Sequence, residues 1–177
     1  GGGTITMSQC VFNGNTTTFN NGSALATISG SSSISNCLFY ENSCATSGKL
    51  GTIHFAGSGN HTFNHTTIAD NTAIGSGTGG ITITAGTVNM KNSIVYGNTT
   101  DDLDHDGGTM NVDESNYGSA QGSLTLNTNN ITTDPLFVLS GSDDYHLLGS
   151  SPAKDNADNT DVSVTLDLDG ITRADPD

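Results

Sequence analysis

One short stretch of the sequence spaces its carboxylates as a calcium-binding loop does. Asp102, Asp104 and Asp106 alternate, Gly107 follows at the sixth position, and Asp113 stands at the twelfth. Alternate carboxylates can surround one hard cation, and a glycine at the sixth position permits the sharp turn that this needs. A glutamate is usual at the twelfth position, and no helix is expected on either side. The spacing predicts a calcium site at Asp102, Asp104, Asp106 and Asp113, and the alternative is a solvated acidic loop.

A second pair of carboxylates lies earlier in the chain. Glu41 and Asp70 each precede an asparagine at the same position of a repeated pattern, so they should stack close together on the surface. Two neighbouring carboxylates could share a proton or hold a cation. The simpler interpretation is two solvated side chains, and we expect no catalytic residues.

A sequence repeat positions these acidic residues. Four segments share one pattern, and the asparagines that close them fall 27, 29 and 27 residues apart. The segments are residues 8–15, 35–42, 64–71 and 91–98. Within each segment the apolar residues alternate with a period of two, which indicates short strands in a stacked, coiled array. We therefore predict an all-β parallel β-helix of about five coils.

Equivalent positions of successive coils should stack at the spacing of hydrogen-bonded strands, about 4.8 Å. Asparagine side chains stacked in this way can hydrogen-bond to one another along the axis. The residues expected to form such a ladder, at a turn, are Asn15, Asn42, Asn71 and Asn98. A second column, expected to face the core, contains Met7, Ile34, Phe63 and Met90.

The cysteines and two of the histidines leave alternatives open. Cys10 and Cys37 occupy the same repeat position, where we favour a reduced stack over a disulfide, and Cys37 with Cys44 is the rival pair. His61 and His65 share one strand parity, which places His61 near the core and His65 near a corner. Histidines satisfied by the fold are expected there rather than a metal pair.

The net charge of the chain comes entirely from its last 77 residues. Residues 1–100 have no net charge, whereas residues 101–177 carry the whole net charge of −14. So acidic a chain lacks the basic surface that binds nucleic acid, and anionic lipid would repel it. No apolar run approaches the ~20 residues that a membrane span needs. We expect no nucleic-acid partner and no membrane span.

The segment after the coils carries a more specific pattern. It contains D-P-L-F-V at 134–138, D-Y-H-L at 144–147, S-P-A-K-D at 151–155 and D-L-D-G at 167–170, followed by Arg173. These motifs resemble the closing block of choice-of-anchor Q β-helix proteins, although Lys154 stands where that family usually has isoleucine. The coils resemble the right-handed parallel β-helix repeats of secreted surface proteins. The resemblance implies a right-handed single-stranded solenoid over residues 1–133 and an irregular acidic block over 134–177, packed on the last coils within one domain.

The same resemblance implies an extracellular or cell-surface location. We therefore expect a non-catalytic structural or adhesive module, namely a surface spacer, a filament subunit or a face that contacts glycans, with calcium as a stabilising ion. The alternative is a calcium-dependent polysaccharide-binding or lyase-like protein. Lyases of this shape use a lysine or arginine beside calcium, and the cationic side chains here are only Lys49, Lys91, Lys154 and Arg173.

Glycosylation sequons are frequent in this Asn- and Thr-rich chain. Ladder members such as Asn15 and Asn98 should be buried and so unavailable to glycan. The remaining sequons, which could carry glycan where exposed, begin at Asn21, Asn60, Asn64 and Asn130.

The first coil is expected to be a site of self-association. Residues 1–7 begin inside a repeat and carry no charge that would discourage strand pairing. An uncovered solenoid end presents unpaired backbone groups, which invite strand addition. If the acidic block covers the other end, the contact is head-to-tail and propagates as a filament of identical subunits. The alternative is that more of the same chain covers the first coil, in which case this segment alone would be monomeric or aggregated.

Overall fold

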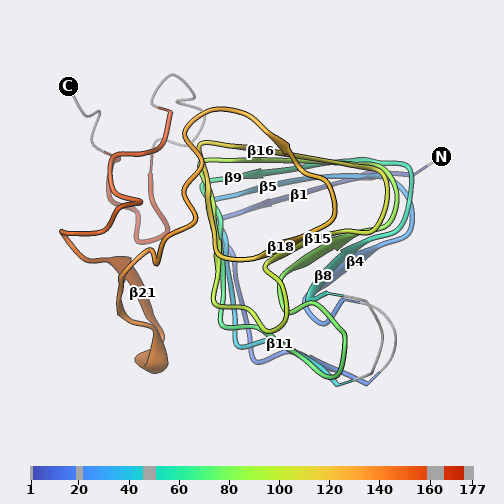
Figure 1. Cartoon of the computed structure of the whole chain (residues 1–177), viewed down its shortest axis with the longest axis horizontal. Coiled ribbons are helices and arrows are strands. Elements are labelled where there is room, and N and C mark those ends of the chain that lie inside the picture. Colours follow the sequence, from blue (N-terminus) through green and yellow to red (C-terminus); the bar gives the residue numbers. More distant parts are fainter. Residues whose placement is uncertain (1, 19–21, 46–50, 159–165, 174–177) are drawn as a thin grey trace.

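The alternating repeats fold as an all-β parallel β-solenoid in the computed structural model, which describes residues 2–18, 22–45, 51–158 and 166–173 (Figure 1). Each strand of one coil pairs in parallel with its equivalent in the next coil. The described residues include a single short 3₁₀ helix, η1 (Ser140–Ser142), and none forms a helix long and apolar enough to cross a membrane. The predicted fold class is confirmed.

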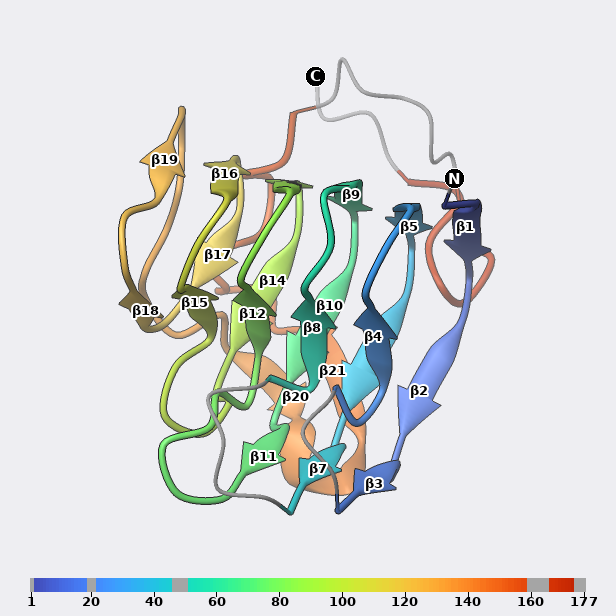
Figure 2. The same ribbon diagram turned by 90° about the vertical axis from the view of Figure 1, so that its right-hand side faces the viewer.

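Four parallel sheets run along the solenoid, and Figure 2 shows their strands in successive rows. Sheet A contains β1 (Thr4–Ser8), β5 (Ser31–Ser35), β9 (Asn60–Asn64), β13 (Thr87–Lys91), β16 (Thr109–Asp113) and β19 (Thr125–Leu126). Sheet B contains β2 (Val11–Asn13), β6 (Leu38–Tyr40), β10 (Thr67–Ala69), β14 (Ile94–Tyr96) and β17 (Asn116–Tyr117). Sheet C contains β3 (Thr16–Thr17), β7 (Ser43–Cys44) and β11 (Thr72–Ala73). Sheet D contains β4 (Leu25–Thr27), β8 (Ile53–Phe55), β12 (Ile81–Ile83), β15 (Leu103–His105) and β18 (Ala120–Gln121).

Alternate residues of these sheets point into the solenoid and form its core. The predicted column of Met7, Ile34, Phe63 and Met90 pairs in register through sheet A, and Val112 continues it. From Ile34 onward every member is buried. Full burial of one such side chain stabilises a fold by about 1.5–3 kcal/mol. The core register predicted from the repeat is therefore confirmed.

The chain turns from sheet A to sheet B through a left-handed residue in every coil. These corner residues have φ between 44° and 53°, and they are Gln9, Asn36, His65, Asn92 and Glu114. Asparagine and histidine are enriched in this conformation, which side chains with a Cβ seldom adopt. The repeated corner explains why a polar residue occupies this position in each coil.

The residue after each corner has a small polar side chain that bonds back to the main chain. Each donates to the carbonyl oxygen two residues earlier, at 2.7–3.2 Å, and the five are Cys10, Cys37, Thr66, Ser93 and Ser115. Because Cys10 and Cys37 point the same way along this column, they stay reduced, and Cys44 forms no disulfide either. Burial raises the pKa of Cys37 to about 11.

The closing block, residues 134–158 and 166–173, lies beside the outer face of sheet B (Figure 1). Its antiparallel strands are β20 (Phe137–Leu139) and β21 (Asp144–Leu147). Tyr145 of β21 packs on Tyr40 of β6, with ring centroids 5.1 Å apart. Arg173 Nη2 donates to Asn36 Oδ1 at 2.7 Å. The contacts of the block therefore extend beyond the predicted last coils, along the flank to the corner between β1 and β2, where Gln9 Nε2 donates to the Asp167 carbonyl at 3.4 Å.

Candidate functional site

The predicted asparagine ladder forms at the corner between sheets B and C. From Asn15 to Asn98, each side-chain nitrogen donates to the side-chain oxygen of the next asparagine at 2.8–2.9 Å. The backbone N–H of each asparagine donates to the same oxygen. Asn42, Asn71 and Asn98 are buried, so these bonds are shielded from water. Asn15 is exposed rather than buried as expected, because none of the described coils covers its outer side.

The ladder ends on a carboxylate, Asp102. Its Oδ1 accepts from the side chain of Asn98 at 2.7 Å and from the Asn98 backbone N–H at 2.9 Å. Its Oδ2 accepts from the backbone N–H groups of Gly118 at 3.0 Å and Ser119 at 2.9 Å. Burial raises the pKa of Asp102, against the opposite effect of these hydrogen bonds. Both carboxylate oxygens of Asp102 thus accept hydrogen bonds from the protein, so this residue terminates the asparagine ladder.

The other three acids of the predicted calcium set lie at different places. Asp104 is the middle residue of β15, is buried, and accepts from Thr78 Oγ1 at 3.1 Å. Asp106 is exposed in the turn after β15, and Asp113 ends β16, where its Oδ1 accepts from Thr128. A strand, rather than a wrapped loop, therefore carries the alternating carboxylates. In the described part of the chain, no group of three or more His, Cys, Asp or Glu is arranged to hold a metal ion.

The carboxylates of Glu41 and Asp70 occupy a second left-handed column, just before the ladder. Its members have φ between 52° and 76° and are Gly14, Glu41, Asp70 and Gly97. Asp70 Oδ2 accepts from Tyr145 Oη at 3.1 Å, so it ties the closing block to the solenoid. Burial raises the pKa of Tyr145, and the charges of Asp70, Glu41 and Asp143 act in the same direction.

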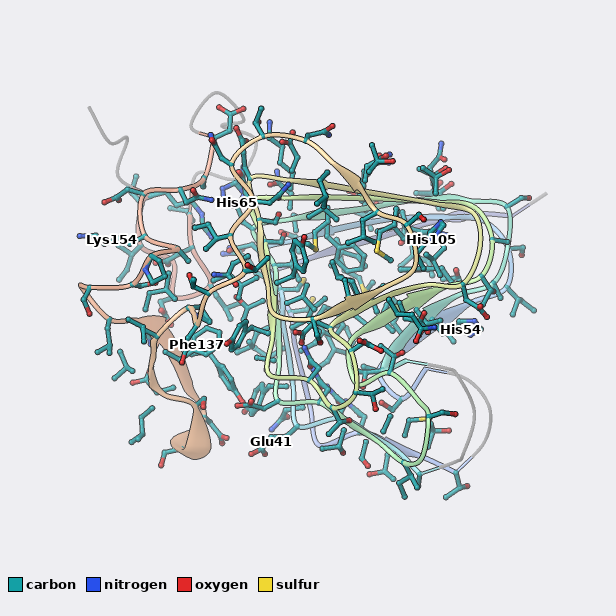
Figure 3. All side chains as sticks on the ribbon, viewed as in Figure 1. Glu41, His54, His65, His105, Phe137 and Lys154 are labelled. Atoms are coloured by element: carbon teal, nitrogen blue, oxygen red, sulfur yellow. The ribbon has the colours of Figure 1, made fainter. Side chains whose placement is uncertain are left out.

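A groove of about 330 Å³ separates the outer face of sheet B from the closing block. Its lining combines amide, imidazole, carboxylate and guanidinium groups, and the residues that matter here are His65, Glu114, Asn116, Tyr145, His146 and Arg173. In Figure 3 His65 lies on the side of the coils that faces the closing block, and His54 lies on the opposite side. The solenoid and the block together therefore form a concave polar surface.

Ion pairs on the block side of the groove join two segments that are distant in sequence. His146 Nδ1 lies 2.6 Å from Asp144 Oδ1, and His146 Nε2 lies 2.7 Å from Asp169 Oδ2. The hydrogen bond to Asp169 is the main cause that raises the pKa of His146, and the bond to Asp144 adds to it. Protonated His146 therefore links β21 to the turn at 167–170.

A lysine on the solenoid side pairs with the block. Lys91 Nζ donates to Asp158 Oδ2 at 2.7 Å and lies 3.7 Å from Glu114 Oε2. Burial raises the pKa of Glu114, as does the charge of Asp158, whereas Lys91 opposes the shift. Glu114 is thus a shielded carboxylate beside the groove.

Asn116 is a groove residue that the sequence did not single out. It pairs in register with Ile94 of β14, which in turn pairs with Thr67 of β10, on the outward row of sheet B. The signal that could have indicated it is an asparagine at the position where the earlier coils have Val11, Leu38, Thr67 and Ile94. That comparison requires the exact coil alignment, which becomes irregular after residue 98.

The two histidines on β9 and at its corner lie where their parity predicts. His61 is fully buried, its Nδ1 lies 3.0 Å from Ser32 Oγ, and its ring stacks on Phe55 with centroids 3.9 Å apart. Burial lowers the pKa of His61. His65 occupies the left-handed corner and faces the groove. They form no metal group within the described ranges.

The predicted glycosylation residues differ in access. Asn60 is exposed at the start of β9, and Asn64 is partly buried at its end. Asn130 donates from Nδ2 to the Val112 carbonyl at 2.9 Å and accepts from the Ser115 N–H at 3.1 Å, so it terminates the column of small polar residues. Asn21 lies outside the described residues.

Searches for similar proteins returned no matching family model, no matching curated protein and no matching solved structure. The assignment of function therefore rests on the geometry of this chain.

Proposed function

We propose that this chain is a non-catalytic structural or adhesive β-solenoid module that extends by stacking head to tail on further copies of itself. The observation that carries the proposal is the uncovered apolar cross-section of the first coil. Ile5 is 45% exposed, whereas Val88 and Met110, at the same register position, are 0% and 1% exposed. An inward-facing isoleucine at the edge of the solenoid suits contact with a further coil, which either a second copy or more of the same protein could supply.

The backbone of the first coil supports the same conclusion. Strands β1, β2, β3 and β4 each form the edge of their sheet, so a complete coil presents unpaired N–H and C=O groups. At the other end, sheets A and D finish in the short edge strands β19 and β18, and Leu126 of β19 is 52% exposed. Sheet B is closed at that end by a bridge between Asn116 and Ile131. Two unlike ends with exposed apolar side chains favour a head-to-tail contact, which propagates without closing.

The closing-block motifs support an extracellular or cell-surface location for such a module. The resemblance to choice-of-anchor Q proteins rests on the D-P-x-F, Y-x-L, S-P-A and D-x-D-G segments, all of which lie in the closing block. Reduced cysteines inside the coils are compatible with this location, because Cys10 and Cys37 are each held by packing and by a carbonyl hydrogen bond rather than by a partner thiol.

Light scattering at increasing protein concentration, together with electron microscopy, tests the proposal. We expect the mass to rise with concentration and straight fibres to form. Ile5→Lys should abolish assembly, because it places a charge in the junction, whereas Val138→Lys, at a similarly exposed position of β20, should assemble normally. A mass of one chain at every concentration would contradict stacking.

A further inference from the structure

We propose that the groove between sheet B and the closing block binds a neutral saccharide. This inference goes beyond the proposed stacking function, because the groove lies on the flank of the solenoid and not at either end. It rests on an unpaired buried acceptor, on the mixed charges of the lining, and on the mixture of polar and apolar groups around the groove.

The unpaired acceptor is the side-chain oxygen of Asn116. Asn116 is 2% exposed and lines the groove, and its Nδ2 donates to the Thr133 carbonyl at 3.0 Å, which fixes which side-chain atom is the oxygen. That Oδ1 has no hydrogen-bond partner among the described residues. A buried acceptor is normally satisfied by protein, water or ligand. A hydrogen-bond donor of a ligand in the groove would therefore satisfy Asn116 Oδ1.

A second acceptor lies on the neighbouring corner. Glu114 Oε2 is buried without a hydrogen-bond partner, and the nearby Lys91 Nζ, at 3.7 Å, is beyond hydrogen-bond distance. Two acceptors from one short segment, two residues apart in sequence, suit a ligand with neighbouring O–H donors. Vicinal hydroxyl groups of a sugar ring provide such a pair.

The charges around the groove favour a neutral ligand. The lining carboxylates are Glu114 and Asp167, and the lining cations are Arg173 and, when protonated, His65 and His146. Because charges of both signs line the groove, neither an anionic nor a cationic ligand would find only opposite charge there. Hydroxyl groups both donate and accept, so one sugar can satisfy amide, carboxylate and guanidinium groups together.

The remaining lining provides shape. Ile94 and Leu147 give apolar surface on opposite walls, and the ring of Tyr145 is held by Phe137 and Tyr40 at centroid distances of 5.2 and 5.1 Å. Small-ligand sites are largely preformed clefts that measure about 300–1,000 Å³. The groove, at about 330 Å³, is at the lower limit of this range and fits one or two sugar units of a chain.

A titration followed by two-dimensional amide NMR tests the proposal. The probes are cellohexaose, maltohexaose, xylohexaose and mannohexaose, with oligogalacturonate as the acidic comparison, and the protein is the non-assembling Ile5→Lys variant. We expect one or more neutral probes to bind with a Kd of about 1 mM or tighter. The amide signals that move should include those of His65, Asn116 and His146. Shifts confined to other faces, binding of oligogalacturonate alone, or no shift at all would overturn the proposal, and Asn116 would then be satisfied by water.

A matched pair of substitutions tests whether the saccharide binds in the groove. Ala157→Trp fills the groove, which Ala157 lines, whereas Ala120→Trp places the same side chain on exposed β18, outside it. We expect at least tenfold weaker binding for the first and unchanged binding for the second; equal affinities would overturn the assignment. If Ala157→Trp does not fold, the signals that move in the parent protein decide the question. Because the parent does not assemble, failure of stacking and failure of sugar binding are observed separately.

Discussion

The solenoid and the closing block are held by different kinds of interaction. Inside the solenoid, the same uncharged contact recurs in coil after coil, as in the ladder from Asn15 to Asn98. The block is held by contacts that occur once each, and several involve charge, such as Lys91 with Asp158 and His146 with Asp169. The repeated uncharged contacts of the solenoid should respond little to salt, whereas the attachment of the block should depend on both pH and salt.

The largest expected effect comes from a charge placed in the repeated core. Phe63→Asp removes a side chain that is 1% exposed and leaves a carboxylate there without a partner, so the chain should not fold. Loss of Phe alone costs about 3–5 kcal/mol. Val138→Asp, on exposed β20 of the block, should change stability by less than about 0.5 kcal/mol. Thermal unfolding followed by circular dichroism measures both; a folded Phe63→Asp protein would refute the core register.

A smaller but still large effect is expected at the end of the ladder. Asp102→Asn keeps the acceptor for Asn98 but turns an amide nitrogen toward the N–H groups of Gly118 and Ser119. Two backbone donors then lose their acceptor; because Gly118 is exposed and Ser119 is half-buried, the cost is about 0.5–1.5 kcal/mol each. Asp106→Asn, at an exposed position, is the matched control and should be nearly neutral. Chemical denaturation of the three proteins gives the differences directly.

The same variants test calcium. If Asp102 acts only as ladder terminator, the parent protein should melt at the same temperature in chelator and in millimolar calcium. A calcium-dependent rise in melting temperature that Asp102→Asn abolishes would instead support the metal site predicted from the sequence, since a ligand that binds only the folded state stabilises it by mass action.

A change of pH should have opposite effects on the two regions: acid should destabilise the solenoid, and base should weaken the attachment of the closing block. Burial lowers the pKa of His61 and of His54, so the folded solenoid resists protonation of both. Their contribution to stability is complete above the unfolded value of about 6.5 and is lost as pH falls from there through the folded pKa. Global unfolding measured from pH 7 to pH 5 should show decreasing stability, and His61→Gln should reduce that dependence.

The attachment of the closing block should weaken on the alkaline side of neutral pH. The pKa of His146 is raised, so its contribution is complete below about 6.5 and is lost as pH rises through the raised folded value. The pKa of Asp144 is lowered by His146, so that side of the contact persists until the pH falls through its lowered value. Hydrogen exchange of β21 should therefore accelerate above neutral pH while sheet A stays protected; equal acceleration in both regions would contradict the comparison.

The smallest effect is expected at the partly exposed ion pair. Lys91→Met removes the contact with Asp158 and should destabilise the protein by about 1 kcal/mol or less, because water screens such pairs. Limited proteolysis should nevertheless cut the block faster, and added salt should have the same effect on the parent protein. Lys154→Met, on the far side of the block in Figure 3, is the control that should change neither.

The sequence alone determined the solenoid, its inward column and its asparagine ladder, because these features arise from identical positions that recur at a nearly constant spacing. Phe63 and Asn71 could be placed from the sequence, since equivalent positions in successive repeats have similar surroundings. Cys10 and Cys37 could be assigned to one column for the same reason.

Only the tertiary structure decided the roles of residues that occur once. Asp102 has the spacing of a calcium ligand, yet it accepts hydrogen bonds from Asn98 and from Gly118, on the next coil. Asn116 acquires its unpaired oxygen, and the groove its second wall, only when the closing block lies on sheet B. The spacing of residues along the sequence indicates which ligands a side chain could bind. Its actual partner is determined by contacts between segments that are far apart in the chain.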